Sequence, residues 1–270
     1  MSTSLPAPLP PADPARLTAD ERQVLHALAL GATTRTRTWL LSLLSALQSR
    51  QASGRAFNAE ALRTQLDALA RQGWAVQHPA RDGYWQVPTE RAGAAYRSLL
   101  DSAPEERLRA ALMRADGLHR SPFHGSSWWS FPNLDAACAL TRLTCFAGQP
   151  REVVAQLESG CGWGTDWPGV IERAVHDVLD AGLLARLHPE MRVDVLSTQL
   201  AVLTTHWVAS DRLDARAQAQ ILLDQARQDP ALEPLVAGSP LPLLLTECHL
   251  LAGCLAESAA ALLFCYPPDE

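Results

Sequence analysis

The sequence predicts a mainly α-helical protein with one short break into extended structure near its N-terminal end. Three observations predict this class. Over most of the chain, apolar residues recur at the three- and four-residue spacing of an amphipathic helix. Glycine and proline interrupt these stretches at intervals that match the length of a single helix. Between Trp74 and Val87 the spacing changes to that of strands around an Asp82-Gly83 turn, which predicts a β-hairpin.

The first expected helix begins after Thr18 and ends at Gly31. Thr18 and Glu21 match the capping box S/T-x-x-E, and glycine is the usual residue just beyond a helix. Residues 33–39 follow with the sequence TTRTRTW. Its alternation of β-branched threonine with arginine predicts a short edge strand whose arginines are exposed.

The second expected helix starts within this run, where Thr36 or Thr38 can cap it and Trp39 turns into the core. Asn58 is the expected cap of a third helix, which stops at Gly73 and leads into the hairpin. A further helix follows Pro88 and completes the region at about residue 100.

Beyond residue 100 the spacing predicts only helices, joined by short loops into antiparallel hairpins. We expect a solenoid-like array or an irregular bundle without a fixed repeat. The aromatic stretch HGSSWWSF, at 124–131, is expected to be a loop between the two regions. The expected helical segments are 104–118, 133–147, 150–159, 167–184, 189–208, 212–228 and 240–265.

The charge is unevenly distributed along the chain, which contains no lysine. Residues 17–100 carry ten arginines and six acids, a net charge of +4, whereas residues 101–270 carry twelve arginines and 22 acids, a net charge of −10. This asymmetry predicts that an anionic partner, if there is one, meets the N-terminal region.

Several classes of protein are not expected. Six cysteines without a CxxC pair favour free thiols in a reducing cytoplasm over disulfides or a zinc site. Residues 1–16 are proline-rich and read as a disordered lead-in, not as a signal peptide. The apolar stretch 241–266 contains Glu247, His249 and Glu257, so we expect a buried helix and no membrane partner.

The stretch LRTQLDALARQGWAVQHPARDGYWQVPTERAGAAY, with the two helices before it, resembles a winged-helix domain over about residues 17–100. Many winged-helix domains bind DNA through the third helix and the wing, and others bind only proteins. Residues 101–270 then form a separate helical domain. A looser likeness of residues 178–196 to this stretch leaves open a second, degenerate copy. On the resemblance, the candidate nucleic-acid ligands are Arg35, Arg37, Asn58, Arg63, Thr64, Arg71 and Arg81.

Two tryptophans are candidate partner-binding residues. If Trp128 and Trp129 are exposed, they would stack on bases or anchor a protein partner. If they are buried, they would seal the interface between the two regions. The sequence contains no nucleophile, phosphate-loop or dinucleotide motif and no metal-ligand spacing, so we expect no enzyme, cofactor or metal.

The stretch LTADERQVLHALALGATTRTRTWLLSLLSAL, at 17–47, resembles the N-terminal helical region of bacterial SNF2-type helicases, although no motor motif is present. The resemblance implies a regulatory module associated with a larger DNA-dependent ATPase. We therefore expect a non-catalytic module that binds DNA. The alternative is a protein-interaction scaffold with a structural winged helix.

Overall fold

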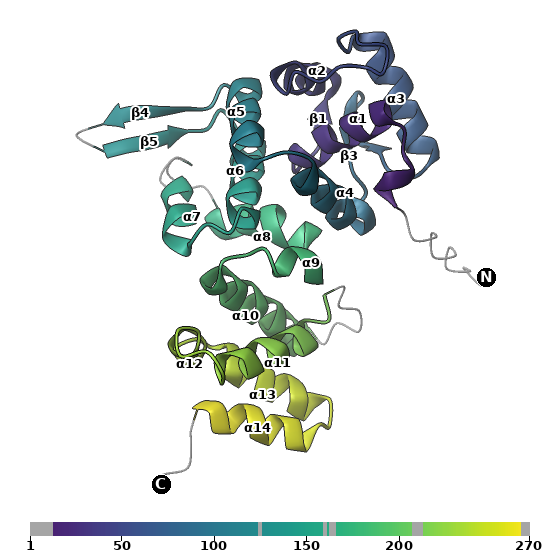
Figure 1. Cartoon of the computed structure of the whole chain (residues 1–270). Coiled ribbons are helices and arrows are strands. Elements are labelled where there is room, and N and C mark those ends of the chain that lie inside the picture. Colours follow the sequence, from purple (N-terminus) through teal and green to yellow (C-terminus); the bar gives the residue numbers. More distant parts are fainter. Residues whose placement is uncertain (1–12, 124–125, 159–160, 162–165, 207–212, 266–270) are drawn as a thin grey trace, which may run out of the picture. The chain divides into compact units, whose positions relative to one another are not determined.

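The computed structural model describes residues 13–123, 126–158, 161, 166–206 and 213–265, which are mainly helical (Figure 1). By their internal contacts, residues 1–143 with 159–178 form one compact unit, and residues 144–158 with 179–270 form a second. The predicted boundary at residue 100 stays a prediction.

Three capped helices open the first unit. The Thr18 side chain accepts a hydrogen bond from the Glu21 N–H while Glu21 bonds back to Thr18, so the predicted capping box is confirmed. Thr36 and Asn58 cap the next two helices. Leu25, Leu43 and Leu66 of these helices are fully buried. The helices are α1 (Ala19–Leu30), α2 (Arg37–Ala46) and α3 (Ala59–Arg71).

A small antiparallel sheet accompanies these helices. The strands β1 (Arg35–Thr36), β2 (Val76–Gln77) and β3 (Tyr84–Gln86) lie in the order β1-β3-β2. Arg35 pairs with Trp85, and Val76 pairs with Gln86, so the predicted hairpin and short edge strand are both confirmed. Gly83 has a φ of +75° in the hairpin turn, a conformation that favours glycine.

Two more helices enclose the core of this unit. In α4 (Thr89–Ser102), Tyr96 and Leu99 are buried, and the helix packs against α1. The next helix, α5 (Glu105–Asp116), packs against α2 and ends at Gly117, whose φ is +66°. Gly117 thus gives α5 the left-handed cap typical of helix ends.

The region around the aromatic stretch differs from the sequence prediction. Strands β4 (His119–Phe123) and β5 (Ser126–Ser130) pair antiparallel, with Arg120 opposite Trp129 and Ser121 opposite Trp128. The expectation of a loop here, and of helices alone beyond residue 100, is therefore wrong. The sequence between the two strands, His124-Gly125, is a weaker turn signal than Asn-Gly or Asp-Gly, and Pro122 within β4 disfavours a strand, so the pairing was not predicted.

Two helices complete the first unit beyond the β4–β5 hairpin. Ala137 and Cys138 of α6 (Leu134–Phe146) pack on Val170 of α8 (Trp167–Val175), which the short helix η2 (His176–Val178) continues. The last residues of α6, beyond Leu143, belong to the second unit.

The second unit is built from helices in the described residues. Within it α10 (Pro189–His206) packs on α13 (Leu241–Leu251), and α13 packs on α14 (Leu255–Cys265). Here the sequence prediction needs three corrections. The segment 240–265 forms two helices broken at Gly253, whose φ is +76°. The segment 167–184 is divided into α8, η2 and α9, and the described residues of 178–196 contain no strand of a second hairpin. The helices are α7 (Arg151–Glu158), α9 (Ala181–Leu184), α10 (Pro189–His206), α11 (Ala215–Ala226), α12 (Glu233–Ala237), α13 (Leu241–Leu251) and α14 (Leu255–Cys265).

Membrane-spanning and disulfide features are not found in the described part of the chain. None of its helices combines the length and the apolar character needed to cross a membrane. Cys138, Cys145, Cys161, Cys248 and Cys254 form no disulfide among the described residues, and Cys138, Cys145 and Cys248 are buried.

The junction between α1 and α4 gives the first unit a pH-dependent stability. His26 is buried there, with its Nε2 atom 3.0 Å from Ser98 Oγ, and burial lowers the pKa of His26 from 6.5 to about 4. As pH falls, His26 is therefore protonated near pH 6.5 in the unfolded chain but only near pH 4 in the folded protein. Stability contributed by neutral His26 is complete above pH 6.5 and is lost as pH falls towards 4.

We expect this loss to reach about 3 kcal/mol at pH 4. Urea unfolding of the wild-type protein and of a His26→Gln variant, at steps from pH 7.5 to pH 4, measures it. The free energy of unfolding of the wild type should fall more steeply with acid than that of the variant. Parallel pH profiles would contradict a buried neutral histidine.

Candidate nucleic-acid interface

Three of the seven predicted nucleic-acid ligands lie on α3, and a fourth, Asn58, caps this helix. Leu62, Leu66 and Leu69 are buried on the side that packs against α1 and α2. The 3.6-residue period then places Arg63 and Arg71 on the exposed side.

Three polar groups on or beside α3 are partly engaged in local hydrogen bonds. The Asn58 Oδ1 atom accepts the Ala61 N–H at 2.8 Å as the helix cap, so only its amide N–H₂ group remains for a base. Thr64 Oγ1 donates to the Glu60 carbonyl at 3.0 Å, and Arg71 Nε donates to the Asp67 carbonyl at 3.3 Å. The Arg71 bond leaves its terminal guanidinium N–H groups free to donate.

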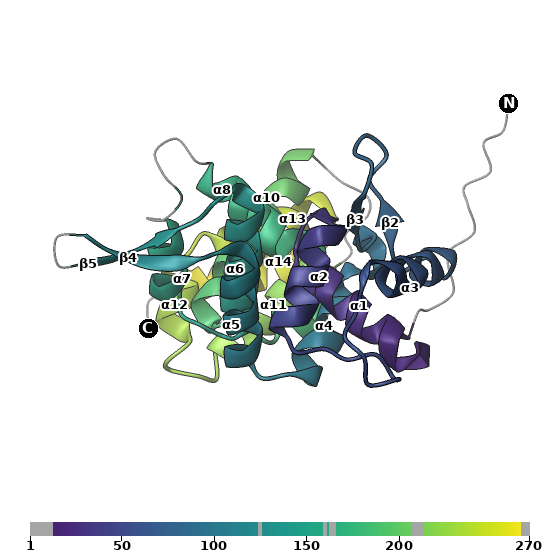
Figure 2. The ribbon, with the colours of Figure 1, turned by 90° about the horizontal axis from the view of Figure 1, so that it is seen from above.

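The β2–β3 hairpin brings two more arginines together at its turn. Arg81 is exposed in the turn, and its guanidinium carbon lies 5.7 Å from the centre of the Tyr84 ring. A Cβ atom built on Gly83 would lie 3.9 Å from Nη2 of Arg37, so the exposed Arg37 reaches the same turn from the start of α2. Figure 2 shows this hairpin next to α3.

Arg35 does not belong to this surface, so the expectation that it is exposed is wrong. Its side chain is 5% exposed, and its Nη1 atom lies 3.1 Å from Asp116 Oδ1. Arg35 also donates to the carbonyls of Gly31 and Asp135, at 3.0 and 2.8 Å. The Trp39 ring covers the guanidinium at 4.1 Å. A cation held in this way links β1 to α5 and α6 and is not available to phosphate.

The surface carries charges of both signs, with arginines in excess over acids. In the described part of the chain, Arg37, Arg63, Arg71 and Arg81 make no ion pair. Three acids, Glu60, Asp67 and Asp82, lie along the same elements, and Asp82 accepts a hydrogen bond from Gln77 at 2.6 Å. Unpaired guanidinium groups retain their full capacity to bind phosphate.

Only the backbone of Trp128 and Trp129 is described by the structure. Trp128 and Trp129 are consecutive residues of β5, where Trp128 pairs with Ser121 and Trp129 with Arg120. Their side chains lie outside the described residues, so the expected stacking or anchoring role stays a prediction.

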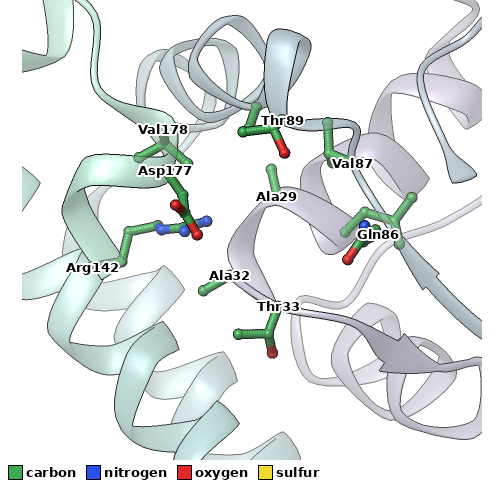
Figure 3. A pocket seen from close by; sticks show the side chains of 11 residues that line it. Ala29, Ala32, Thr33, Gln86, Val87, Thr89, Arg142, Asp177 and Val178 are labelled. Atoms are coloured by element: carbon green, nitrogen blue, oxygen red, sulfur yellow. The ribbon is translucent and has the colours of Figure 1, made fainter. Parts of the chain in front are cut away.

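A small pocket in the first unit contains a charged pair that the sequence did not single out (Figure 3). It has a volume of about 70 Å³, and Arg142 of α6 and Asp177 of η2 point toward one another there. Arg142 is 3% exposed and donates to the carbonyls of Ala174 and Arg173 at 2.7 and 2.6 Å. It therefore binds the last carbonyls of α8 as a helix cap.

Among the residues that the structure describes, no three His, Cys, Asp or Glu side chains are grouped so that they could hold a metal ion. Burial lowers the pKa of His176 and His249 and raises that of Cys145 to about 12. These shifts keep the imidazoles neutral and the thiol protonated near neutral pH.

Comparison of the chain with protein-family models, with curated proteins and with solved structures finds no significant match.

Proposed function

We propose that residues 17–100 form a winged-helix module that binds DNA without catalysing a reaction. The observation that carries the proposal is the set of four exposed arginines without ion-pair partners in the described residues. Arg63 and Arg71 lie on α3, and Arg37 and Arg81 lie at the β2–β3 turn. The order of three helices and a hairpin, with β1 paired to β3, supports the winged-helix assignment.

In this proposal α3 enters the major groove and the β2–β3 turn follows the neighbouring backbone. Arg63 and Asn58, at the N-terminal end of α3, would read base edges, because arginine pairs with guanine and the asparagine amide can donate. Arg37 and Arg81 would hold phosphates and set the register of the module on the duplex. Asp67 in the middle of the exposed face disfavours dense phosphate contact, so we expect moderate affinity.

The test is a fluorescence-anisotropy titration of labelled duplex and single-stranded DNA at low salt. We expect the Arg63→Ala/Arg71→Ala/Arg81→Ala variant to bind duplex DNA about 100-fold more weakly than the wild type. The matched control is Arg151→Ala/Arg192→Ala/Arg227→Ala, which removes the same charge from the second unit and should change affinity by about twofold or less. Absence of wild-type binding, or an equal loss in both variants, would overturn the proposal.

A protein-interaction scaffold is the second candidate, and it rests on the apolar surface of α13 and α14. Leu250, Leu251, Leu255 and Leu263 are between 52% and 69% exposed within the described residues. Clustered exposed leucines are typical of contact surfaces. The same titration separates the two candidates, because only the first requires affinity for DNA.

A further inference from the structure

A groove in the first unit is lined by three arginines and no acidic side chain. It lies between α1, the end of α2, the end of α4 and the start of α5, and its volume is about 430 Å³. Pockets for small molecules commonly have volumes of about 300–1,000 Å³, so the groove has room for one. Its cations are Arg22, Arg50 and Arg107.

Two of these arginines are held in place by backbone carbonyls. Arg107 Nη2 donates to the Leu47 carbonyl at 2.6 Å, and Arg22 Nη2 donates to the Leu17 carbonyl at 3.0 Å. Each bond fixes a guanidinium group and leaves its other N–H groups as donors.

The third arginine stands on the loop that follows α2. Arg50 is exposed and makes no ion pair within the described part of the chain. Its backbone is fixed, because the Gln23 side chain donates to the Arg50 carbonyl at 2.8 Å. The guanidinium group of Arg50 is therefore free to move over a groove whose other two arginines are anchored.

His26 and Ser102 add uncharged polar groups to the lining. His26 is one turn from Arg22 along α1 and is 8% exposed, and its Nδ1 atom is 3.3 Å from Ser102 Oγ. The apolar side chains of Leu99 and Leu108 complete the lining. The groove thus offers cationic donors together with an apolar wall.

Three acids near the lining residues bond to groups outside the groove. Asp20 accepts the Ala52 N–H at 2.7 Å, Glu21 bonds to Thr18 and Gln72, and Glu105 pairs with Arg109. These carboxylates are engaged outside the groove. A ligand of negative charge is therefore the one that the groove favours.

We propose that this groove binds a small phosphorylated molecule, with its phosphate oxygens between Arg22, Arg50 and Arg107 and its uncharged part against Leu99 and Leu108. Guanidinium groups bind phosphate through paired N–H donors, which suits a dianion better than a single carboxylate. None of the proposed DNA ligands on α3 and the β2–β3 turn lines this groove, so the two proposals use different residues.

Isothermal titration calorimetry with inorganic pyrophosphate at low ionic strength tests the site. We expect saturable binding with one site per chain, and about tenfold weaker binding by an Arg50→Glu variant. Arg50 is exposed, so this change should leave the fold intact. Arg63→Glu makes the same charge change on α3 and should alter the affinity by about twofold or less. Absence of saturable binding, or an equal loss in both variants, would overturn the proposal.

Two further readouts locate the ligand. A bound dianion next to His26 stabilises its protonated form, so NMR titration of the ring should show a higher pKa of His26 with pyrophosphate than without it. An unchanged His26 titration would place the anion elsewhere and contradict the proposal. Arg50→Glu should also keep wild-type affinity for duplex DNA, because Arg50 is not one of the proposed DNA ligands. A parallel loss of DNA binding would make the groove part of the DNA surface and contradict the proposal.

Discussion

Replacing Asp116 by alanine is expected to lower the free energy of unfolding of the first unit by about 3–5 kcal/mol. The Asp116 carboxylate is buried between Arg35, at 3.1 Å, and the Trp39 indole N–H, at 2.6 Å. Its removal leaves the Arg35 cation buried without its acid, and desolvation already lowers the pKa of Arg35. An unpaired buried cation is among the most unfavourable groups in a protein interior.

Urea unfolding followed by circular dichroism measures this effect. The matched control is Glu105→Ala, because Glu105 lies on the same helix and pairs with Arg109, but both side chains are about a quarter exposed. That variant should lose about 1 kcal/mol or less. A double variant, Arg35→Met/Asp116→Leu, should recover part of the loss, since it removes both charges together. If Asp116→Ala is no less stable than Glu105→Ala, Arg35 is not held as described.

Replacing Arg142 by leucine is expected to destabilise the first unit by about 3–5 kcal/mol, since two hydrogen bonds from a charged group are lost. Their acceptors, the carbonyls of Arg173 and Ala174, stay at the end of α8 without a donor. Arg142 also lies 5.6 Å from the Tyr96 ring, so this contact between α6 and α4 is lost as well.

The control for Arg142 is Arg173→Ala. It removes a nearby exposed arginine side chain but keeps the Arg173 carbonyl that Arg142 binds. We expect a change within about 0.5 kcal/mol for this variant. Comparable losses in the two variants, measured by the same unfolding experiment, would show that charge and not the hydrogen bonds to α8 is responsible.

Local signals in the sequence predicted local structure well. The capping box at Thr18, the caps at Thr36 and Asn58, and the hairpin with Gly83 depend on contacts within a few residues, and each is confirmed. The strand at 35–36 was predicted from its threonine and arginine alternation and pairs with β3.

Predictions that depend on distant contacts failed for a physical reason. Arg35 was expected to be exposed, but its acid, Asp116, is 81 residues away in the sequence and nothing local indicates the pair. Two local features were missed as well: the β4–β5 hairpin, whose turn carries the single glycine Gly125, and the end of α13 at Gly253. Likewise, no local signal joins Arg22, Arg50 and Arg107, which come from three different elements.

The salt dependence of DNA affinity tests the central claim most directly. Each phosphate contact by an arginine releases counterions and adds about −0.9 to the slope of log K against log salt concentration on duplex DNA. The Arg37→Ala/Arg81→Ala variant should therefore have a slope shallower than that of the wild type by about 2. A variant slope equal to that of the wild type would show that the β2–β3 turn does not contact phosphate, and would contradict the proposed interface.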